Sequence, residues 1–420
     1  MKYDSEFYDV IVIGGGPSGM MAAGTAAKNG AKVLLIEKNA DLGEKLKITG
    51  GGRCNITNYE LDNRKLLKHY GEAEPFLYSP FSQFSVKDTF TFFEKKKLPL
   101  VIQARNRVFP KTERAYDVYL VLKKFLKDVG VKVIYQAPVI DIQFRNNEII
   151  AVDTKKTRYQ AKKYIFSVGG VSAPETGSTG DGFKWLEKLG HHIHKPSPDI
   201  VPLKSNANFL KDLSGTSLSF TKISFFLNGE KQFSKKGKIL FTHFGLSSPL
   251  ILNLARDVRK LLDQGEVYAE IDFFPDTHKG NLDKRLLKLL QKYPNRDLKN
   301  ILPEILPKKL AQYIVQKLAI HKKANELTRE ERKSLREEIK HFKVPIQGLM
   351  GMDRAVVADG GVSLEEIDTK TMQSKLIKNL FVTGDMLHIN RPSGGYSLQL
   401  CWTTGYVAGK HASKKENEKT

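Results

Sequence analysis

Cysteine is scarce in this sequence of 420 residues, since only Cys54 and Cys401 occur and they stand far apart. Two isolated cysteines exclude a C-x-x-C redox motif and a cysteine-rich metal site, and they fit a reducing compartment, so we expect a cytoplasmic protein. Long apolar runs are also missing, because none reaches the ~18 residues that a membrane span needs. The mixed-charge start MKYDSEFYD does not resemble a signal peptide. We therefore expect no membrane association.

Acidic residues are few relative to basic ones, since 46 Asp and Glu stand against 68 Lys and Arg and give a net charge of +22. A basic excess of this size favours a polyanionic partner such as RNA. A generally basic, solvated surface explains the composition equally well, and charge alone does not separate the two. The length predicts two or three domains and leaves the oligomeric state open, with a monomer favoured.

The most informative pattern lies in residues 9–37, DVIVIGGGPSGMMAAGTAAKNGAKVLLIE. Apolar runs at 10–13 and 32–36 predict two buried strands, and the alanine-rich segment between them predicts a helix. Gly14, Gly16 and Gly19 form a G-x-G-x-x-G turn where the first strand meets the helix. Strand, turn, helix and strand in this order predict a dinucleotide site.

Each part of this turn has a physical role in holding a dinucleotide. Gly14 permits the tight exit from the strand, Gly16 leaves room for backbone amides to approach a pyrophosphate, and Gly19 lets the helix pack close to the sheet. The start of the helix offers unpaired N–H groups and a positive dipole end, which suit a diphosphate. Glu37 ends the second strand, where an acid binds ribose hydroxyls. The predicted contacts are Gly14, Gly16, Pro17, Ser18, Gly19, Glu37 and Lys38.

Two further glycine-rich stretches are candidates for the same site. The run GGGRCN at 50–55 is too rich in glycine for the interior of a helix or strand, and it predicts a loop whose backbone lies against a flat ligand. Residues 131–166 alternate with a period of two and predict a β-meander whose last strand ends at SVGG. The candidate contacts here are Gly51, Gly52, Arg53, Cys54, Asn55, Val139, Gly169 and Gly170.

The C-terminal part regains this character. LFVTGD at 380–385 predicts a buried strand followed by Gly384 and Asp385, and residues 396–412 predict a helix opened by Gly394 and Gly395. This arrangement is the second half of an FAD-binding fold, so it favours FAD over NAD. The helix start would face the flavin, where a positive dipole end stabilises the reduced ring. The predicted contacts are Gly384, Asp385, Gly394, Gly395, Tyr396 and Ser397.

Changes of period along the chain predict its organisation. Residues 61–128 are mostly helical by pattern, short strands fill 197–275, and 280–343 are helical and lysine-rich. The fold class that we predict is α/β, with an interrupted Rossmann-like FAD-binding domain, an inserted β-barrel and a basic helical subdomain. The boundaries that we expect are 1–195 and 347–414 for the FAD-binding domain, 196–278 for the barrel, 279–346 for the helices and 415–420 for a disordered tail.

Longer motifs surround these turns from one end of the chain to the other. They are GGGPSGMMAA at 14–23, GGGRCNITN at 50–58, RVFPKTERAYDV at 107–118, GGVSAPETGSTGDGF at 169–183, FTHFGLSSP at 241–249, GGVSLEEIDTKTMQSKL at 360–376 and GGYSLQLCWTTGYVAG at 394–409. By these motifs the sequence resembles the BaiN/YhiN-type flavoproteins, a family of NAD(P)/FAD-dependent oxidoreductases. Asp385 stands where that family usually has Glu, and Ser397 where it usually has Asn.

The resemblance implies a reductase of activated C=C bonds. One branch of the family resembles ribosomal-RNA dihydrouridine synthases, which reduce a uridine of large-subunit rRNA, and the lysine-rich helices suit that branch. NAD(P)H is the expected electron donor. It would visit the flavin transiently, because no second G-x-G-x-x-G occurs. Cys54 is the leading candidate proton donor and Arg53 a candidate for binding an anion or carbonyl. A packed loop cysteine and a structural salt bridge explain these two residues equally well.

Two other functions fit the same residues. One is a small-molecule reductase or amine oxidase on this scaffold, with steroid-type enones or aminoacetone as substrate. The other is a flavin-bound RNA-binding protein with little turnover. His191, His192 and His194 suggest a metal site, but they lack nearby carboxylate or cysteine partners in the sequence and precede a proline-rich connection. We therefore expect a linker there and no metal.

Overall fold

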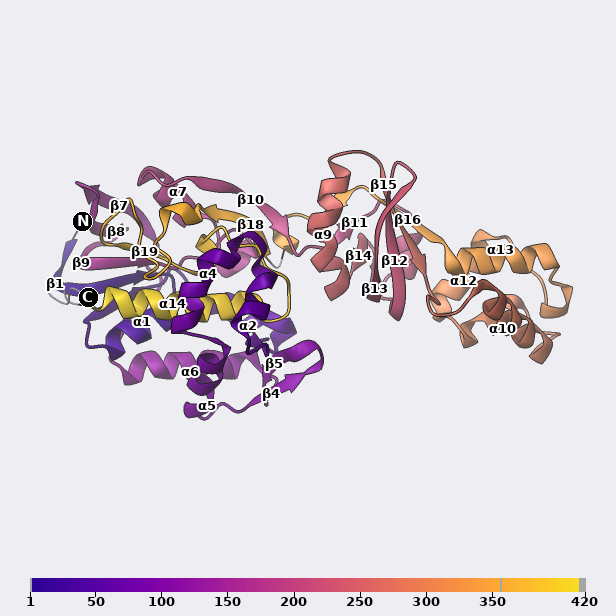
Figure 1. Cartoon of the computed structure of the whole chain (residues 1–420), viewed down its shortest axis with the longest axis horizontal. Helices are drawn as coiled ribbons and strands as arrows, with labels where there is room; N and C mark the ends of the chain where they lie inside the picture. The colour runs from indigo at the N-terminus through magenta and orange to yellow at the C-terminus, as the bar shows by residue number, and fades with distance from the viewer. Residues whose placement is uncertain (1, 356, 415–420) are drawn as a thin grey trace. The chain divides into compact units, whose positions relative to one another are not determined.

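The computed structural model describes residues 2–355 and 357–414, and it divides the chain into two compact units (Figure 1). Unit 1 joins Met1–Ser197 to Ala358–Thr420, and unit 2 is Pro198–Val357. Unit 1 is thus built from both ends of the chain, and unit 2 is inserted between them. The predicted tail at 415–420 lies outside the described residues, and the finer boundaries of the sequence analysis remain a prediction.

Unit 1 is organised around a mixed sheet in the strand order β6-β2-β1-β9-β8-β7, with β19 also pairing with β9. The strands β6, β2, β1, β9 and β19 run parallel to one another. Strand β8 pairs in antiparallel fashion with both of its neighbours, β9 and β7. Their bounds are β1 Lys2–Ile13, β2 Val33–Ile36, β6 Lys132–Ile134, β7 Val139–Arg145, β8 Glu148–Thr154, β9 Thr157–Phe166 and β19 Leu380–Val382.

Helices cover this sheet because its central strands are apolar throughout. All four residues of β2 are buried, as are Val10 to Ile13 of β1, so both sheet faces need cover. The helices α1 (Pro17–Lys28) and α14 (Tyr396–Ala412) pack on its strands, and α6 (Ala115–Asp128) packs against α1. The bounds of α14 coincide with the helix that the sequence predicts. Because the central strands are parallel, their carboxyl ends meet at one edge of the sheet.

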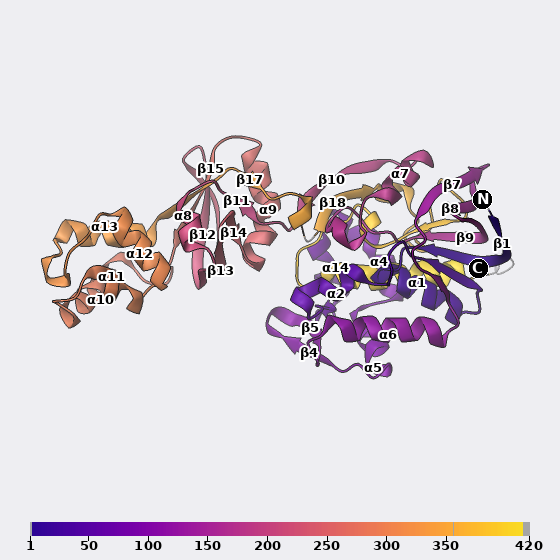
Figure 2. The same ribbon diagram turned by 180° about the vertical axis from the view of Figure 1, so that it is seen from behind.

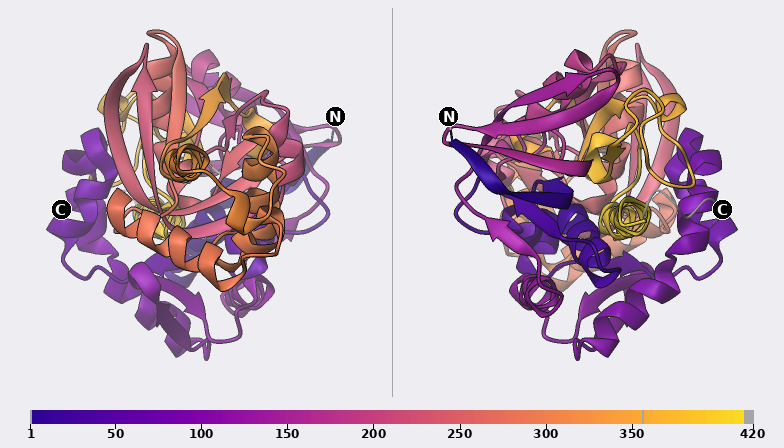
Figure 3. Two further views of the ribbon diagram at one scale, coloured as in Figure 1. Left: turned by 90° about the vertical axis from the view of Figure 1, so that its right-hand side faces the viewer. Right: turned by 90° about the vertical axis from the view of Figure 1, so that its left-hand side faces the viewer.

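The two ends of the chain join where α14 packs against α1, and Figure 3 shows α14 in yellow along its axis beside the sheet. A Cβ added at Gly405 would lie 2.4 Å from the backbone oxygen of Ser18. One added at Gly409 would lie 2.3 Å from the backbone oxygen of Ala22. Glycine is therefore required at both positions for the helices to approach this closely.

Shorter elements complete unit 1. The segment predicted as mostly helical also contains a small antiparallel sheet, in which β5 pairs with β3 and β4. The strands β10 and β18 pair with each other and carry the chain between the two units. The remaining bounds are α2 Glu44–Ile48, α3 Asn63–Leu67, α4 Glu74–Gln83, α5 Val86–Lys95, α7 Asp181–Lys188, β3 Thr57–Asn58, β4 Leu100–Gln103, β5 Arg107–Pro110, β10 Ile193–Asp199 and β18 Val357–Val362.

Unit 2 contains a second sheet, in the order β16-β15-β12-β13-β14-β11-β17 (Figure 2). The predicted β-barrel is not confirmed, because no pairing between β16 and β17 closes the sheet within the described residues. The bounds are β11 Leu203–Lys204, β12 Ser217–Leu227, β13 Glu230–Thr242, β14 Gly245–Ser247, β15 Val267–Asp272, β16 Phe342–Ile346 and β17 Gly348–Leu349.

The predicted basic helical subdomain is not confirmed, because the helices of unit 2 share a core with its sheet. Leu286 and Leu335 from the helices belong to one continuous hydrophobic cluster with Ile223 and Phe225 of the sheet. One shared core therefore holds the helices and the sheet together. Their bounds are α8 Phe209–Leu213, α9 Pro249–Leu262, α10 Lys279–Lys292, α11 Leu298–Ile301, α12 Lys308–Lys317 and α13 Arg329–Lys340. In neither unit does a described helix have the length and apolarity to cross a membrane.

We predict opposite effects of the same substitution at two helical glycines. Gly409→Ala should destabilise unit 1 by about 1–3 kcal/mol, because the new methyl meets the α1 backbone. Gly280→Ala in α10 should stabilise unit 2 by up to about 1 kcal/mol, since its Cβ meets nothing within 4 Å and alanine favours helix. Thermal unfolding midpoints measure both effects. A Gly409→Ala protein as stable as wild type would contradict the close helix contact.

We predict that unit 1 loses stability in mild acid through His411, near the end of α14. Burial, assisted by Lys414 and Lys410, lowers the pKa of His411 to about 4 from 6.5. The folded chain therefore keeps this imidazole neutral, and stability falls as pH drops from 6.5 towards 4 because the unfolded chain binds the proton first. The thermal unfolding midpoint should fall less between pH 7 and pH 5 in His411→Gln than in wild type. Equal falls in the two proteins would assign the acid sensitivity to other residues.

Candidate functional site

A cleft opens at the carboxyl ends of the parallel strands of unit 1. Its lining includes residues that directly follow four of these strands: Gly14 after β1, Glu37 after β2, Ser167 after β9 and Thr383 after β19. Hydroxyl groups of Ser167 and Thr383 lie 2.9 Å apart and join two of these strand ends. Ligands of open α/β sheets bind at this edge, so the cleft stands where a dinucleotide is expected.

The G-x-G-x-x-G turn forms one wall of the cleft. Gly14 has φ +98°, and a Cβ there would lie 2.6 Å from the backbone oxygen of Ser167. A Cβ on Gly19 would lie 1.9 Å from the backbone oxygen of Gly14, so Gly19 packs within the turn instead of lining the cleft. Gly16 differs, because a Cβ there meets nothing within 4 Å. The open space at Gly16 is therefore available to a ligand.

The start of α1 has the chemistry to hold a diphosphate. Gly16 is the N-cap, and it has no side chain to accept a hydrogen bond from the first turn. The hydroxyl of Ser18 lines the cleft, is buried and has no hydrogen-bond partner within the described residues. A phosphate oxygen would satisfy both the hydroxyl and the free amides, since helix starts attract anions. The residues present thus fit the diphosphate of a dinucleotide.

Glu37 is the acid of the second strand, and its side chain is only 6% exposed. Its carboxylate accepts hydrogen bonds from the amides of Gly15 and Asn39, at 2.7 Å and 2.8 Å. These bonds hold the carboxylate at the mouth of the glycine turn, beside the start of α1. This position fits an acceptor for the hydroxyls of an adenosine ribose.

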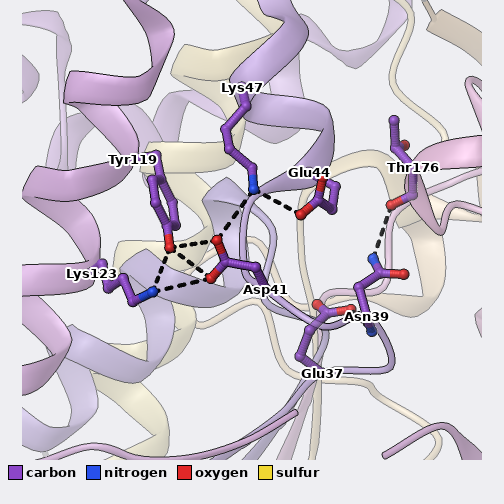
Figure 4. A network of polar contacts seen from close by, with 8 residues as sticks. All are labelled: Glu37, Asn39, Asp41, Glu44, Lys47, Tyr119, Lys123 and Thr176. Carbon is purple, nitrogen blue, oxygen red and sulfur yellow. Dashed lines mark hydrogen bonds and ion pairs between the residues drawn. The ribbon is translucent and has the colours of Figure 1, made fainter. Parts of the chain in front are cut away.

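A polar network fixes the loop after β2, which borders the cleft (Figure 4). Asp41 accepts hydrogen bonds from the Tyr119 hydroxyl at 2.6 Å, from Lys123 at 3.2 Å and from Lys47 at 3.3 Å. Burial raises the pKa of Asp41, but these hydrogen bonds, with one from the Leu42 amide, outweigh burial and lower the pKa to about 2. The permanently ionised carboxylate therefore anchors the loop to α6.

Two lysines bring positive charge to the cleft. Lys38 Nζ lies 2.6 Å from Thr179 Oγ1 and 3.0 Å from Asp181 Oδ2, so it joins β2 to the start of α7. Lys45 of α2 donates to Ser172 Oγ at 3.2 Å. Burial lowers the pKa of Lys45, and the nearby Asp385 opposes that shift. Both lysines line the cleft and can face an anionic ligand.

Arg391 links the two positions at which this chain departs from the pattern expected of the family. Its buried guanidinium forms an ion pair with Asp385 and donates to Ser397 Oγ at 3.1 Å. It also donates to the backbone oxygen of Ile389 at 2.6 Å. One arginine thus couples the strand end at β19 to the start of α14.

The GGGRCN loop stands outside the lining of the cleft. Cys54 has φ +62° and is fully buried, and burial raises the pKa of its thiol to about 12 against a small opposing effect of Thr49. Arg53 lies over the ring of Phe109 at 4.6 Å and pairs with Glu113 at 3.7 Å. Cβ atoms on Gly51 and Gly52 would meet nothing within 4 Å. The loop therefore has open space beside Gly51 and Gly52, whereas Cys54 is packed inside the protein.

The glycines that open α14 make a close protein contact. A Cβ on Gly395 would lie 2.2 Å from the backbone carbon of Thr57, so this glycine lets β3 approach the helix. Asn58 donates to the backbone oxygen of Gly394 at 3.3 Å. Tyr396 is nearly buried, and its backbone oxygen accepts from the Tyr70 hydroxyl at 2.9 Å. These contacts fix the position of the helix start.

The structure brings about half of the predicted cofactor contacts together in the cleft. Those that line it are Gly14, Gly16, Pro17, Ser18, Glu37, Lys38, Val139, Gly169, Gly384 and Asp385. Those that do not line it are Gly19, Gly51, Gly52, Arg53, Cys54, Asn55, Gly170, Gly394, Gly395, Tyr396 and Ser397. Whether any of them contacts a cofactor remains a prediction.

Sequence analysis did not select several residues that line the cleft. Cys401 lies in the motif at 394–409, and Ser178 and Thr179 lie in the motif at 169–183, but no pattern within those motifs distinguishes them. Lys45 belongs to no motif. Asn39 gives no signal in the sequence, because its side chain donates to the backbone oxygen of Thr176, 137 residues away, at 3.1 Å.

His191 shows why the histidine cluster was hard to interpret. Its carboxylate partner lies 175 residues away, since Nδ1 is 2.8 Å from Glu366 Oε2, while Nε2 is 2.9 Å from Ser374 Oγ. Ser374 is buried, and its oxygen also accepts the amides of Leu376 and Ile377, so this Ser-His-Glu arrangement is structural. No group of potential metal ligands occurs among the described residues.

Fold and cleft together define a dinucleotide-binding protein of the Rossmann type. The chain belongs to the family of HI0933-like proteins, whose Rossmann-domain model matches residues 8–411. It is 28% identical to a 3-dehydro-bile acid delta(4,6)-reductase of Clostridium scindens, over 96% of this chain and 98% of that protein. It is also 28% identical to a ribosomal RNA dihydrouridine synthase of Haemophilus influenzae, over 98% of this chain and 100% of that protein.

Two solved structures share this fold, and both are oxidoreductases by their names. One is a 3-ketosteroid-delta4-(5alpha)-dehydrogenase from Rhodococcus jostii, with a TM-score of 0.53, 13% identity and coverage of 99% of this chain and 98% of that chain. Another is the FrdA chain of the Escherichia coli quinol fumarate reductase, with a TM-score of 0.55, 13% identity and coverage of 100% and 72%. Family and fold thus support a flavoprotein with a Rossmann-like FAD-binding α/β fold, of the FAD-dependent oxidoreductase class.

We predict that Gly16→Val weakens cofactor binding without unfolding the chain. The added side chain enters the open space beside the start of α1, where a Cβ contacts no protein atom within 4 Å. The dissociation constant for FAD should rise about tenfold or more, because a loss of 1.4 kcal/mol in binding already produces tenfold. Titration of the FAD-free protein with FAD, followed by flavin absorbance, measures this affinity. The unfolding midpoint should match that of FAD-free wild type, and an unchanged affinity for FAD would contradict the placement of the diphosphate.

Proposed function

We propose that this protein is an FAD-dependent oxidoreductase that uses NAD(P)H to reduce an activated C=C bond, and that its substrate is a uridine of large-subunit (23S) rRNA, which becomes dihydrouridine. The similarity to the Haemophilus influenzae ribosomal RNA dihydrouridine synthase carries this proposal, because it covers 100% of that protein. The net charge of +22 supports a polyanionic substrate.

The residues of the cleft would divide the cofactor between them. The amides at the start of α1 and the Ser18 hydroxyl would hold the diphosphate, and Glu37 would hold the ribose hydroxyls. Asp385, oriented by Arg391, would face the ribityl side. When bound, FAD supplies two-electron chemistry by accepting a hydride from NAD(P)H and donating it to the C=C bond. No second G-x-G-x-x-G provides a separate site for NAD(P)H.

Cys54 and Arg53 are the proposed residues at the reacting end. Burial keeps the Cys54 thiol protonated at neutral pH, as a proton donor requires. Because the thiol is fully buried, donation needs a shift of the loop at 50–55 that exposes it. Arg53 is half exposed and offers its guanidinium to a carbonyl or phosphate of the substrate.

A small-molecule reductase is the second candidate. The bile acid reductase of Clostridium scindens is as similar to this chain, at 28%, as the rRNA enzyme of Haemophilus influenzae. The same cleft would then serve an enone of steroid type. The net charge of +22 favours the RNA candidate, since a polyanion is attracted by it more strongly than a small molecule is.

The test is to map dihydrouridine in large-subunit rRNA by mass spectrometry, in cells with and without this protein. We expect deletion to remove one dihydrouridine and re-expression to restore it. Binding of RNA should weaken steeply with salt, as counterions are released. Unchanged rRNA, together with NAD(P)H oxidation stimulated by a steroid enone, would establish the small-molecule function. RNA binding without any substrate-dependent oxidation would establish a binding protein.

Cells that express Cys54→Ser test the proposed proton donor in the same assay. Reduction of the uridine should slow about 10²- to 10⁴-fold if the thiol donates the proton. The FAD content should stay at the wild-type level, because serine fills the same buried position. Full dihydrouridine formation by Cys54→Ser would assign Cys54 a packing role.

A further inference from the structure

Phe220 is exposed to an extent that no other large apolar side chain of the described chain matches, at 82%. It lies within β12 of unit 2, where β12 pairs with β13. Burial of phenylalanine usually stabilises a fold, so exposure in the middle of a strand gains nothing from the hydrophobic effect. A single exposed apolar side chain is ordinary, but the backbone at this position is not.

The backbone at Phe220 is in a conformation that disfavours phenylalanine. Its φ is +60°, a region that glycine and asparagine enter and bulky residues avoid. The register of β12 and β13 shifts here, because Leu218 faces Ile239 and Thr221 faces Gly237. Ser219 and Phe220 together therefore oppose Lys238 alone, which is a β-bulge. Bulges redirect a side chain out of the regular alternation of a strand.

The surroundings of this bulge are basic. The segment 217–242, which forms β12, β13 and their turn, contains five lysines and a single acidic residue, Glu230. Lys238 is exposed opposite the bulge, and Lys222 faces Lys236 directly across the strands. Like charges placed opposite each other destabilise a strand pair. An exposed aromatic ring, a strained backbone and two lysines that face each other thus occur together. This combination does not favour the folded state.

Most of these lysines remain without an acidic partner. Within the described residues, Lys236 pairs with Asp276, whereas Lys222, Lys231, Lys235 and Lys238 form no ion pair. Lys222 faces Asp272 of β15, but that carboxylate pairs with Lys340 at 2.6 Å. The helices of unit 2 contain more basic residues, but many of these pair with acids, as in Lys279–Glu337, Lys317–Glu338 and Arg332–Asp283. Four lysines of β12 and β13 thus stay outside ion pairs in the strands that carry the exposed ring.

We propose that the ring of Phe220 stacks on an unpaired base of RNA while Lys238 and Lys222 contact the adjacent phosphates. Aromatic rings beside cationic side chains are how proteins hold single-stranded nucleic acid, because every base has a stacking face. A duplex does not suit this surface, since its bases are already stacked on one another. The inference rests on the proposed rRNA substrate and adds that the substrate docks through an unpaired nucleotide on unit 2.

The test measures binding of the full-length protein to a labelled single-stranded RNA by fluorescence anisotropy over a range of salt. Phe220→Ala should weaken binding about tenfold without changing the salt dependence, because stacking releases no counterion. Phe220→Trp should bind like wild type. Lys238→Gln should reduce the slope of log affinity against log salt by about 1. The matched control is Phe144→Ala, at a 39% exposed phenylalanine of β7 in unit 1, and it should change neither quantity.

A glycine variant separates a binding role from a folding role. Phe220→Gly should bind RNA as weakly as Phe220→Ala, yet its thermal midpoint should rise by about 2–4 °C because glycine adopts φ +60° without strain. A lower midpoint in this variant would show that Phe220 serves the fold and would overturn the proposal.

Three other results would also overturn it. If Phe220→Ala and Phe220→Gly bind RNA like wild type while cells with Phe220→Ala keep their dihydrouridine, the docking surface is wrong and the proposed function stands. If Phe220→Ala instead converts a dimer to a monomer in gel filtration and leaves RNA binding intact, the bulge is a contact between two copies. If the wild-type protein binds no RNA at low salt, the rRNA substrate and the docking surface fail together.

Discussion

The close contact between α1 and α14 is the constraint on which the structure of unit 1 depends. Gly405 and Gly409 bring the backbone of the C-terminal helix to the carbonyl groups of Ser18 and Ala22. That contact joins the two ends of the chain, and it sets Cys401 of α14 beside Ser18 of α1 on the wall of one cleft. Unit 2 can be inserted between α1 and α14 in the sequence because the contact between these two helices does not depend on the residues of unit 2.

The cleft combines two general properties of the fold. Parallel strands end at one edge of the sheet, so residues from four distant parts of the chain meet there. The helix that follows the first strand starts at the same edge and offers free amides, with a buried hydroxyl beside them. Glu37, held by two amides, and Arg391, paired with Asp385, then fix the polar groups before any ligand arrives. The site is preorganised for an anionic, hydroxyl-bearing ligand.

Unit 2 differs from unit 1 in how its helices and its sheet are joined. Its helices and its sheet share one hydrophobic core, so the change of period in the sequence marks a change of secondary structure within one unit. Part of the basic charge of its helices is neutralised by acids on neighbouring helices, as in Lys279–Glu337 and Arg332–Asp283. Counting lysines in the sequence points to the helices, whereas the fold also places lysines of β12 and β13 beside an exposed aromatic ring.

Sequence alone was sufficient where the rule is local. The G-x-G-x-x-G turn, the acid at the end of the second strand and the helix at 396–412 all follow from neighbouring residues, because turns and periodicity act over a few positions. The motifs along the chain identified the family, and the family-model match over residues 8–411 confirms that membership.

Only the tertiary structure decided which polar groups find partners. The GGGRCN loop looked the same in sequence as the glycine turn of the cleft, yet packing buries its cysteine and stacks its arginine on Phe109. His191 lacked a carboxylate in the sequence and found Glu366, and Arg391 found Asp385 and Ser397. Burial and long-range hydrogen bonds depend on what the folded chain brings together, and neither composition nor spacing records that.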